Sequence, residues 1–236
     1  MSRIYSNSLF HYTKNAKNLL GILKNGFKVS YADEQFKDNN GVTNHIYIPM
    51  VCFCDIPLNN IDLVTYGGFA IGVDRVWGNS RGLTPVAYYP INKENYFYKY
   101  ISGVFEEYNK SHNSDLRKIL GFVKPFRKLN EKNYAIGKRR ENYIEREWRK
   151  VYFKKWIVSS CPLKTYNKSI TINGFVSFST ENVSFIIVPN DVEKSKIISQ
   201  IKRLKTIGSS KNRSNSKTKL DLISKVLTIK QIKENF

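Results

Sequence analysis

The sequence predicts an α+β fold followed by a basic helical tail. Short segments rich in β-branched and aromatic residues alternate with segments whose apolar residues recur at helical spacing. Of the 236 residues, 41% are hydrophobic and 14% aromatic, which is enough for a packed core without disulfide or metal support. Residues 191–236 contain a single aromatic residue, Phe236. We therefore predict an α/β domain over 1–190 and a tail over 191–236.

The N-terminal segment predicts a strand followed by a helix. Leu9–Tyr12 is apolar and strand-like, and Gly26 stands where the glycine that ends a helix belongs. Residues 28–44 are polar and contain Asp38-Asn39-Asn40-Gly41, which indicates a loop. The apolar residues that recur at helical spacing after this strand, and that predict the helix, are Leu19, Ile22, Leu23 and Phe27.

The middle of the chain predicts more strands and two helices. His45–Asp55 is strand-like but contains Pro49, which we expect to interrupt it. Asp74 is a plausible helix N-cap after Gly67-Gly68 and a strand. The predicted strands here are 69–73 and 85–89, and the predicted helices are 92–110 and 114–121.

The C-terminal part predicts strands and then the tail. The alternating pattern of residues 143–153 favours a strand, although a helix also fits. The tail is predicted as two helices joined by a flexible basic linker near 208–218. The other predicted strands are 170–178 and 183–188, and the tail helices are 191–206 and 219–234.

Charge is the strongest feature of the composition. Lys and Arg total 39 and Asp and Glu total 19, so the formal net charge is +20. Such a surface attracts nucleic acid, anionic nucleotides or acidic lipid headgroups, although biased base composition also produces a high pI. No apolar run is long enough to span a membrane, and the N-terminus does not resemble a signal peptide. The three cysteines fit a reducing compartment, so we expect a cytoplasmic protein.

Several common catalytic motifs do not occur. The sequence has no P-loop, no dinucleotide-binding glycine motif, no H-E-x-x-H and no G-x-S-x-G. Cys52 and Cys54 would share one face of a strand, but structural zinc usually needs four ligands from paired motifs. We interpret them as core cysteines and expect no metal.

Two segments could bind or transform an anionic ligand. His11 and Thr13 lie two apart on a predicted strand, just before a helix whose N-terminus would favour a pyrophosphate. The alternative is a core histidine followed by a Thr N-cap. Tyr66 precedes Gly67-Gly68, where a flat ring could stack, although a tyrosine at a helix-to-strand turn fits equally.

The segment Glu145-Arg146-Glu147-Trp148-Arg149 could supply a catalytic carboxylate. On a strand, Glu145 and Glu147 share one face, and neighbouring cations would keep them ionised. The alternative is an exposed strand with alternating salt bridges. Basic and aromatic residues also alternate over 138–155, which suits a nucleic-acid strand but also a solvated surface. The cations considered for nucleic-acid binding are Lys138, Arg139, Arg140, Arg149 and Lys154.

Residues 11–26 resemble the opening motif of DarT-like ADP-ribosyltransferases, H-x-T-x₃-N-L-x₂-I-L-x₂-G. The matching residues are His11, Thr13, Asn18-Leu19, Ile22-Leu23 and Gly26, and this sequence has one additional residue between Thr13 and Asn18. Residues 9–90 and 141–188 resemble the AbiGi family of phage abortive-infection proteins more closely. The most distinctive shared segment is C-F-C-D-I-P-L, 52–58. The other matching segments are I-P-M-V (48–51), Y-G-G-F-A-I-G (66–72), Trp77-Gly78, T-P-V-A-Y (84–88) and E-R-E-W-R (145–149).

The DarT-like resemblance implies an ADP-ribosyltransferase-like core of two small facing sheets with flanking helices, and NAD⁺ as substrate. His11 and Thr13 would hold the adenosine side, and Tyr66 with Gly67 would stack the nicotinamide. Glu147 would be the catalytic carboxylate, with Glu145 as the other candidate. The family pattern also expects an arginine for the pyrophosphate, and the sequence does not choose among Lys28, Arg75 and Arg81.

We therefore predict a phage-defence or toxin–antitoxin component that transfers ADP-ribose from NAD⁺ to nucleic acid. The alternative comes from the AbiGi resemblance, which implies an antitoxin of a two-gene system. Such a protein would be a non-catalytic module that binds nucleic acid or a cognate nucleotidyltransferase toxin. The predicted partners are therefore nucleic acid and a cognate toxin or antitoxin.

Overall fold

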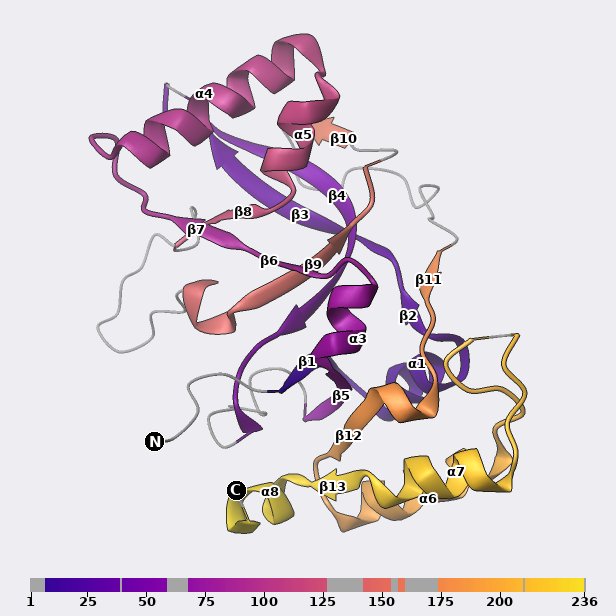
Figure 1. Ribbon diagram of the computed structural model, residues 1–236. Coiled ribbons are helices and arrows are strands. Elements are labelled where there is room, and N and C mark those ends of the chain that lie inside the picture. The colour runs from indigo at the N-terminus through magenta and orange to yellow at the C-terminus, as the bar shows by residue number, and fades with distance from the viewer. Residues whose placement is uncertain are drawn as a thin grey trace. The chain divides into compact units, whose positions relative to one another are not determined.

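The computed structural model confirms the α+β class. The chain forms two compact units, in each of which strands and helices pack together (Figure 1). Unit 1 consists of Met1–Lys28, Cys52–Leu83 and Asn173–Phe236, and unit 2 of Val29–Val51 and Thr84–Ile172. The predicted boundary at residue 190 stays a prediction. The structure describes residues 7–38, 40–58, 68–126, 142–153, 157–159, 174–209 and 211–235.

A sheet with apolar central strands forms the centre of unit 1. Its strand order is β13-β12-β5-β1, and the last residues of β4 pair with β1 at Phe10 and Cys54. A Cβ at Gly72 would lie 2.7 Å from the Phe10 ring, so this glycine allows the ring to pack on the sheet. The strands are β1 (Ser8–Thr13), β5 (Phe69–Asp74), β12 (Val183–Val188) and β13 (Val226–Thr228).

The helices of unit 1 have side-chain N-caps where the sequence offers them. Asp74 caps its helix by accepting from the backbone N–H groups of Val76 and Trp77, as predicted. Gly26 follows the first helix at φ +92°, a conformation that only glycine adopts freely. The helices are α1 (Ala16–Asn25), α3 (Arg75–Ser80), α6 (Asp191–Arg203), α7 (Ser216–Ser224) and α8 (Ile229–Asn235).

The predicted helix 219–234 is wrong in its middle. Helix α7 ends at Ser224, strand β13 follows, and α8 begins at Ile229. The strand pairs in parallel with the end of β12, where Ile186 lies opposite Val226. The sheet edge thus provides hydrogen-bond partners that override the helical pattern of the isolated sequence. Two short strands, β2 (Phe27–Lys28) and β11 (Phe175–Val176), complete the unit.

A long hairpin organises unit 2. Strands β3 (Ser30–Lys37) and β4 (Thr43–Cys54) pair over eight positions around the predicted Asp38–Gly41 turn, and the last residues of β4 belong to unit 1. The prediction of a loop over 28–44 was therefore wrong outside this turn. Pro49 does not interrupt β4, because it lies opposite Tyr31 and its carbonyl accepts from the Tyr152 N–H.

Further strands and two helices cover this hairpin. Helix α4 (Tyr96–Ser111) packs on β3, where the Phe105 and Phe36 rings stack at 5.6 Å, and α5 (Ser114–Leu120) lies beside α4 (Figure 1). None of the described helices has the length and apolar character that a membrane span requires. The remaining strands of the unit are β6 (Thr84–Pro85), β7 (Ala87–Tyr89), β8 (Val123–Pro125), β9 (Glu147–Val151) and β10 (Ile157–Ser159).

Candidate functional site

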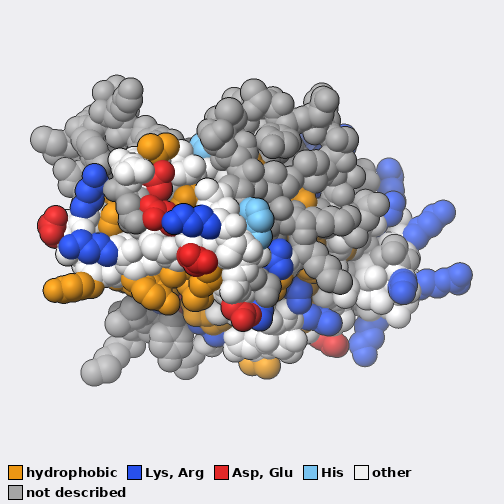
Figure 2. All heavy atoms as spheres, turned by 90° about the horizontal axis from the view of Figure 1, so that it is seen from above, with side chains coloured by type: hydrophobic (Ala, Val, Ile, Leu, Met, Phe, Trp, Pro, Cys, Tyr) orange, Lys and Arg blue, Asp and Glu red, His pale blue; other side chains and the backbone are white. Residues whose placement is uncertain are grey.

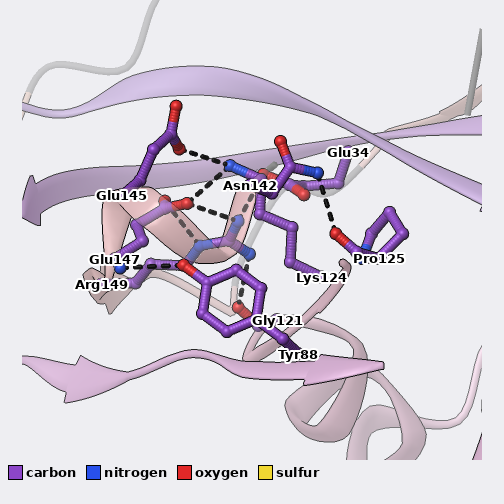
Figure 3. Close-up of polar contacts among 9 residues, drawn as sticks. All are labelled: Glu34, Tyr88, Gly121, Lys124, Pro125, Asn142, Glu145, Glu147 and Arg149. Carbon is purple, nitrogen blue, oxygen red and sulfur yellow. Dashed lines mark hydrogen bonds and ion pairs between the residues drawn. The ribbon is translucent and has the colours of Figure 1, made fainter. Parts of the chain in front are cut away.

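The two predicted catalytic carboxylates meet in unit 2, but not in the predicted way. Glu145 ends a short 3₁₀ helix (Asn142–Glu145) and Glu147 begins β9, with Arg146 between them at φ +42°. The expectation that both glutamates alternate along one strand is therefore wrong. They are brought together instead by Lys124 of β8, whose Nζ donates to Glu145 Oε2 at 3.1 Å and to Glu147 Oε2 at 2.7 Å (Figure 3).

Glu147 is buried, and both of its carboxylate oxygens accept hydrogen bonds. Its residue is 6% exposed. Oε1 accepts from Arg149 Nε at 2.8 Å, and Oε2 accepts from Arg149 Nη2 at 3.2 Å in addition to Lys124. The Glu147 backbone N–H donates to the Tyr88 hydroxyl at 2.9 Å, and its carbonyl accepts from the Val86 N–H. The position of this carboxylate is thus fixed from several directions.

Arg149 lies in the middle of the same cluster. Its residue is 0% exposed, and its guanidinium donates to Glu147, to Glu34 Oε1 at 2.7 Å and to the Gly121 carbonyl at 3.2 Å (Figure 3). This placement opposes the predicted phosphate contact, because the guanidinium does not reach the surface. We call Glu34, Lys124, Glu145, Glu147 and Arg149 the buried charge network.

The buried charge network holds three carboxylates and two cations. Burial alone would raise the pKa of Glu147, but Arg149 and Lys124 hold it well below the usual value. Burial raises the pKa of Glu34 despite the attraction of the same two cations. Burial would lower the pKa of Lys124, but Glu147, Glu34 and Glu145 raise it above the usual value. Glu34 therefore takes up a proton more readily than Glu147 does, and Lys124 stays charged.

The geometry of the network is typical of a structural ion-pair cluster. A carboxylate has about four lone-pair positions, and Glu147 uses three of them on Arg149 and Lys124. The residues come from β3, β8, the 3₁₀ helix and β9, so the network connects elements that are distant in sequence. Glu145 is the more accessible acid, with 31% of its side chain exposed.

The predicted nucleotide-binding pair lies in unit 1. His11 donates from Nδ1 to the Cys52 carbonyl at 2.8 Å, and its ring lies 5.2 Å from that of Phe27 and 5.5 Å from that of Phe53. Burial lowers the pKa of His11, and the hydrogen bond to Cys52 offsets part of this effect. Thr13 is also buried, and the N-cap of α1 is Asn15. This arrangement matches a neutral core histidine.

The segment C-F-C-D has a structural role in unit 1. Its Cys52 carbonyl accepts the hydrogen bond from His11. Its Asp55 forms an ion pair with Arg75, with 2.6 Å between Asp55 Oδ1 and Arg75 Nη2. Arg75 was one of the cations considered for a pyrophosphate, and it is held by this carboxylate. Cys52 and Cys54 are half-buried. Within the described part of the chain, no three His, Cys, Asp or Glu side chains are placed to hold a metal ion.

The buried charge network contains two residues that were not predicted from the sequence. Glu34 and Lys124 were missed because they are far from Glu147 in sequence and Glu34 was assigned to a loop. For Glu34 the available signal was Phe36, which lies two residues later and would share its face if the segment were a strand. The predicted site residues Tyr66, Gly67, Lys138, Arg139, Arg140 and Lys154 lie outside the described residues.

Comparison with known proteins gives the class of the protein. The family model described as "Putative abortive phage resistance protein AbiGi, antitoxin" matches residues 25–189. A relative from Lactococcus lactis subsp. cremoris, "Abortive phage resistance protein AbiGi", is 29% identical over 227 residues, covering 80% of this chain and 89% of the relative. No solved structure matches the chain.

These matches define a protein of abortive infection, a form of phage defence. The chain belongs to the AbiGi family, and this part of the sequence prediction is confirmed.

Proposed function

We propose that this protein is a non-catalytic antitoxin that acts by binding, and that Glu147 is structural. The observation that carries the proposal is the state of Glu147, which is 6% exposed and bonded to two cations. The antitoxin named in the family description supports it. The partner that fits is the toxin of the same two-gene system.

Electrostatics argues against Glu147 as the catalyst of ADP-ribose transfer. That reaction needs a carboxylate whose negative charge stabilises a developing oxocarbenium ion. Lys124 and Arg149 lie within 2.8 Å of Glu147 and already neutralise it. They would also repel a positively charged transition state at this distance. A carboxylate in this setting stabilises the fold better than it stabilises a cation.

An NAD-dependent ADP-ribosyltransferase acting on nucleic acid, with an ADP-ribosyltransferase-like core, is the second candidate. Two observations favour it. Glu145 is partly exposed, and among the described residues its ion-pair partner is Lys124. His11 and Thr13 lie on one strand directly before α1, in the order of the DarT-like motif. In this reading Glu145, not Glu147, would be catalytic.

The test is toxin neutralisation together with NAD⁺ turnover. Cells would co-express the cognate toxin with the wild-type chain, with Glu145→Gln, or with the double variant Glu147→Gln/Arg149→Met. The double variant removes an acid and its partner together, which limits the uncompensated buried charge. We expect both to neutralise the toxin as the wild type does, provided that circular dichroism shows a folded protein.

Purified proteins would be offered labelled NAD⁺ with DNA, RNA or cell protein. The antitoxin proposal expects no label on any acceptor and no nicotinamide release. Label that appears with the wild type and disappears with Glu145→Gln would contradict it and establish the second candidate.

A further inference from the structure

A groove lined by cations lies in unit 1, away from the residues described above. It has a volume of about 520 Å³ and is formed by the end of α6, the loop 204–215 and the start of α7. Its charged lining consists of Arg203, Lys205, Lys211, Arg213 and Lys219. We call it the basic groove.

The positive charge of the basic groove is not neutralised within the described part of the chain. Residues 194–220 contain nine Lys and Arg and no Asp or Glu. None of the five lining cations forms an ion pair with a described residue. Lys and Arg side chains also project at the right-hand edge of Figure 2, which in Figure 1 is the side of the loop between α6 and α7. Concentrated charge in a concave surface attracts an anionic partner.

The loop that carries these cations is held by hydrogen bonds at both ends and in its middle. Across the loop, the Ile207 N–H donates to the Asn212 carbonyl at 3.1 Å and the Ser214 N–H to the Lys205 carbonyl at 3.0 Å. The Gly208 N–H donates to the Leu23 carbonyl of α1 at 2.7 Å. The backbone that carries Lys205, Lys211 and Arg213 is therefore positioned before any ligand arrives, which lowers the backbone entropy lost on binding.

The chemistry of the lining indicates phosphate groups as the ligand. Two of the five cations are arginines, whose planar guanidinium matches a phosphate with two parallel hydrogen bonds. Among the described residues that line the groove, none has an aromatic side chain. Proteins that hold single strands add aromatic side chains on which bases stack. A lining without such rings suits the outer backbone of a duplex, where the bases are covered.

We propose that the basic groove binds the phosphate backbone of double-helical nucleic acid without reading its sequence. The contact would be made by Arg203, Lys205, Lys211 and Arg213, with Lys219 held in place by its bond to the Lys202 carbonyl. The proposal goes beyond the proposed antitoxin function and does not depend on how the toxin is neutralised.

The test measures duplex binding and its salt dependence. Fluorescence anisotropy would follow labelled duplex DNA and duplex RNA of about 20 base pairs, between about 50 and 200 mM salt. The groove variant is Lys205→Gln/Lys211→Gln/Arg213→Gln. A matched control, Lys14→Gln/Lys110→Gln/Lys233→Gln, removes the same charge from exposed lysines outside the groove. Thermal unfolding would show that both remain folded.

Each lost phosphate contact lowers the slope of log affinity against log salt by about 0.9. We expect the groove variant to lose a slope of about 3 and more than about tenfold in affinity, and the control to lose much less. The relative affinity for DNA and RNA duplexes identifies the biological source of the backbone.

Three results would overturn the proposal. One is an equal loss in the groove and control variants, which would mean that net charge alone binds. Another is tighter binding of a single strand than of the duplex. The last is displacement of the duplex by polyglutamate at equal charge, which would indicate an acidic protein partner. Toxin neutralisation is not measured here, so failure of this proposal leaves the antitoxin proposal untouched.

Discussion

The buried charge network of unit 2 and the basic groove of unit 1 both contain Lys and Arg side chains, but these side chains have opposite surroundings in the two places. In the network, Lys124 and Arg149 are bonded to carboxylates and shielded from water. In the groove, five cations surround an open space, and none of the described residues that line it is a carboxylate. A buried cation must be paired because an unpaired charge in the interior is very costly. A solvated cation needs no partner and remains available for one.

This difference shows how a large net charge divides between fold and recognition. The segment Glu145–Arg149 looked like the richest functional motif in the sequence, yet Glu147 and Arg149 are buried and paired with each other. The tail looked like a simple basic extension, yet it forms a shaped surface. The distinction depends on whether carboxylates from elsewhere in the chain reach the cations.

The largest expected effect comes from unpairing the network. We expect Arg149→Met to lower the free energy of unfolding by about 3–5 kcal/mol, because Glu147 and Glu34 then lose their buried partner. Arg213→Met in the basic groove is the matched control, with an expected change within about 0.5 kcal/mol. Urea denaturation measures both. Similar losses in the two variants would remove the contrast on which this comparison rests.

A smaller effect is expected from the loop of the basic groove. Gly208 has φ +67°, and an added Cβ would lie 2.1 Å from the Phe178 carbonyl oxygen. We expect Gly208→Ala to cost about 2–3 kcal/mol in stability and to weaken duplex binding, because the loop must move. Gly82→Ala is the control, since Gly82 has φ +75° but open space around its Cβ position. It should cost about 1 kcal/mol and leave binding unchanged. Equal effects on binding would mean that loop geometry is unimportant.

The parts of the fold that local pattern determines could be predicted. Strand β12 and helices α4 and α5 lie within a few residues of the predicted ranges, because periodicity and turn residues are local signals. Strand β3 could not be predicted, because its polar residues become a strand only through pairing with β4. The same holds for β13, which forms on the edge of β12.

The candidate site was predictable only in part, for a related reason. Glu145 and Glu147 are brought together by Lys124 and not by a shared strand face, and nothing near them in sequence indicates Lys124. The burial of Arg149 depends on Glu34, a residue 115 positions away. The basic groove requires the loop 204–215 to fold back onto α1. A segment rich in Ser, Asn and Lys contains no local signal that predicts this contact.

The smallest expected effect is the pH dependence of Glu34. Burial raises the pKa of this carboxyl in the folded state above its usual value of 4.5. Glu34 therefore contributes most to stability below that pH, and this contribution is lost as pH rises through the folded-state pKa. Glu34→Gln mimics the protonated acid but does not titrate, so the stability of this variant should not show this loss as the pH rises.

We therefore expect Glu34→Gln to gain stability relative to the wild type as the pH rises from about 5 to about 8. Urea denaturation at the two pH values gives this difference, with Glu94→Gln at an exposed position as the baseline. The opposite trend, a wild type that gains on the variant with rising pH, would mean that Glu34 is ionised beside Arg149. The network would then carry one more negative than positive charge. Arg149 would pair with ionised Glu34 and ionised Glu147 alike.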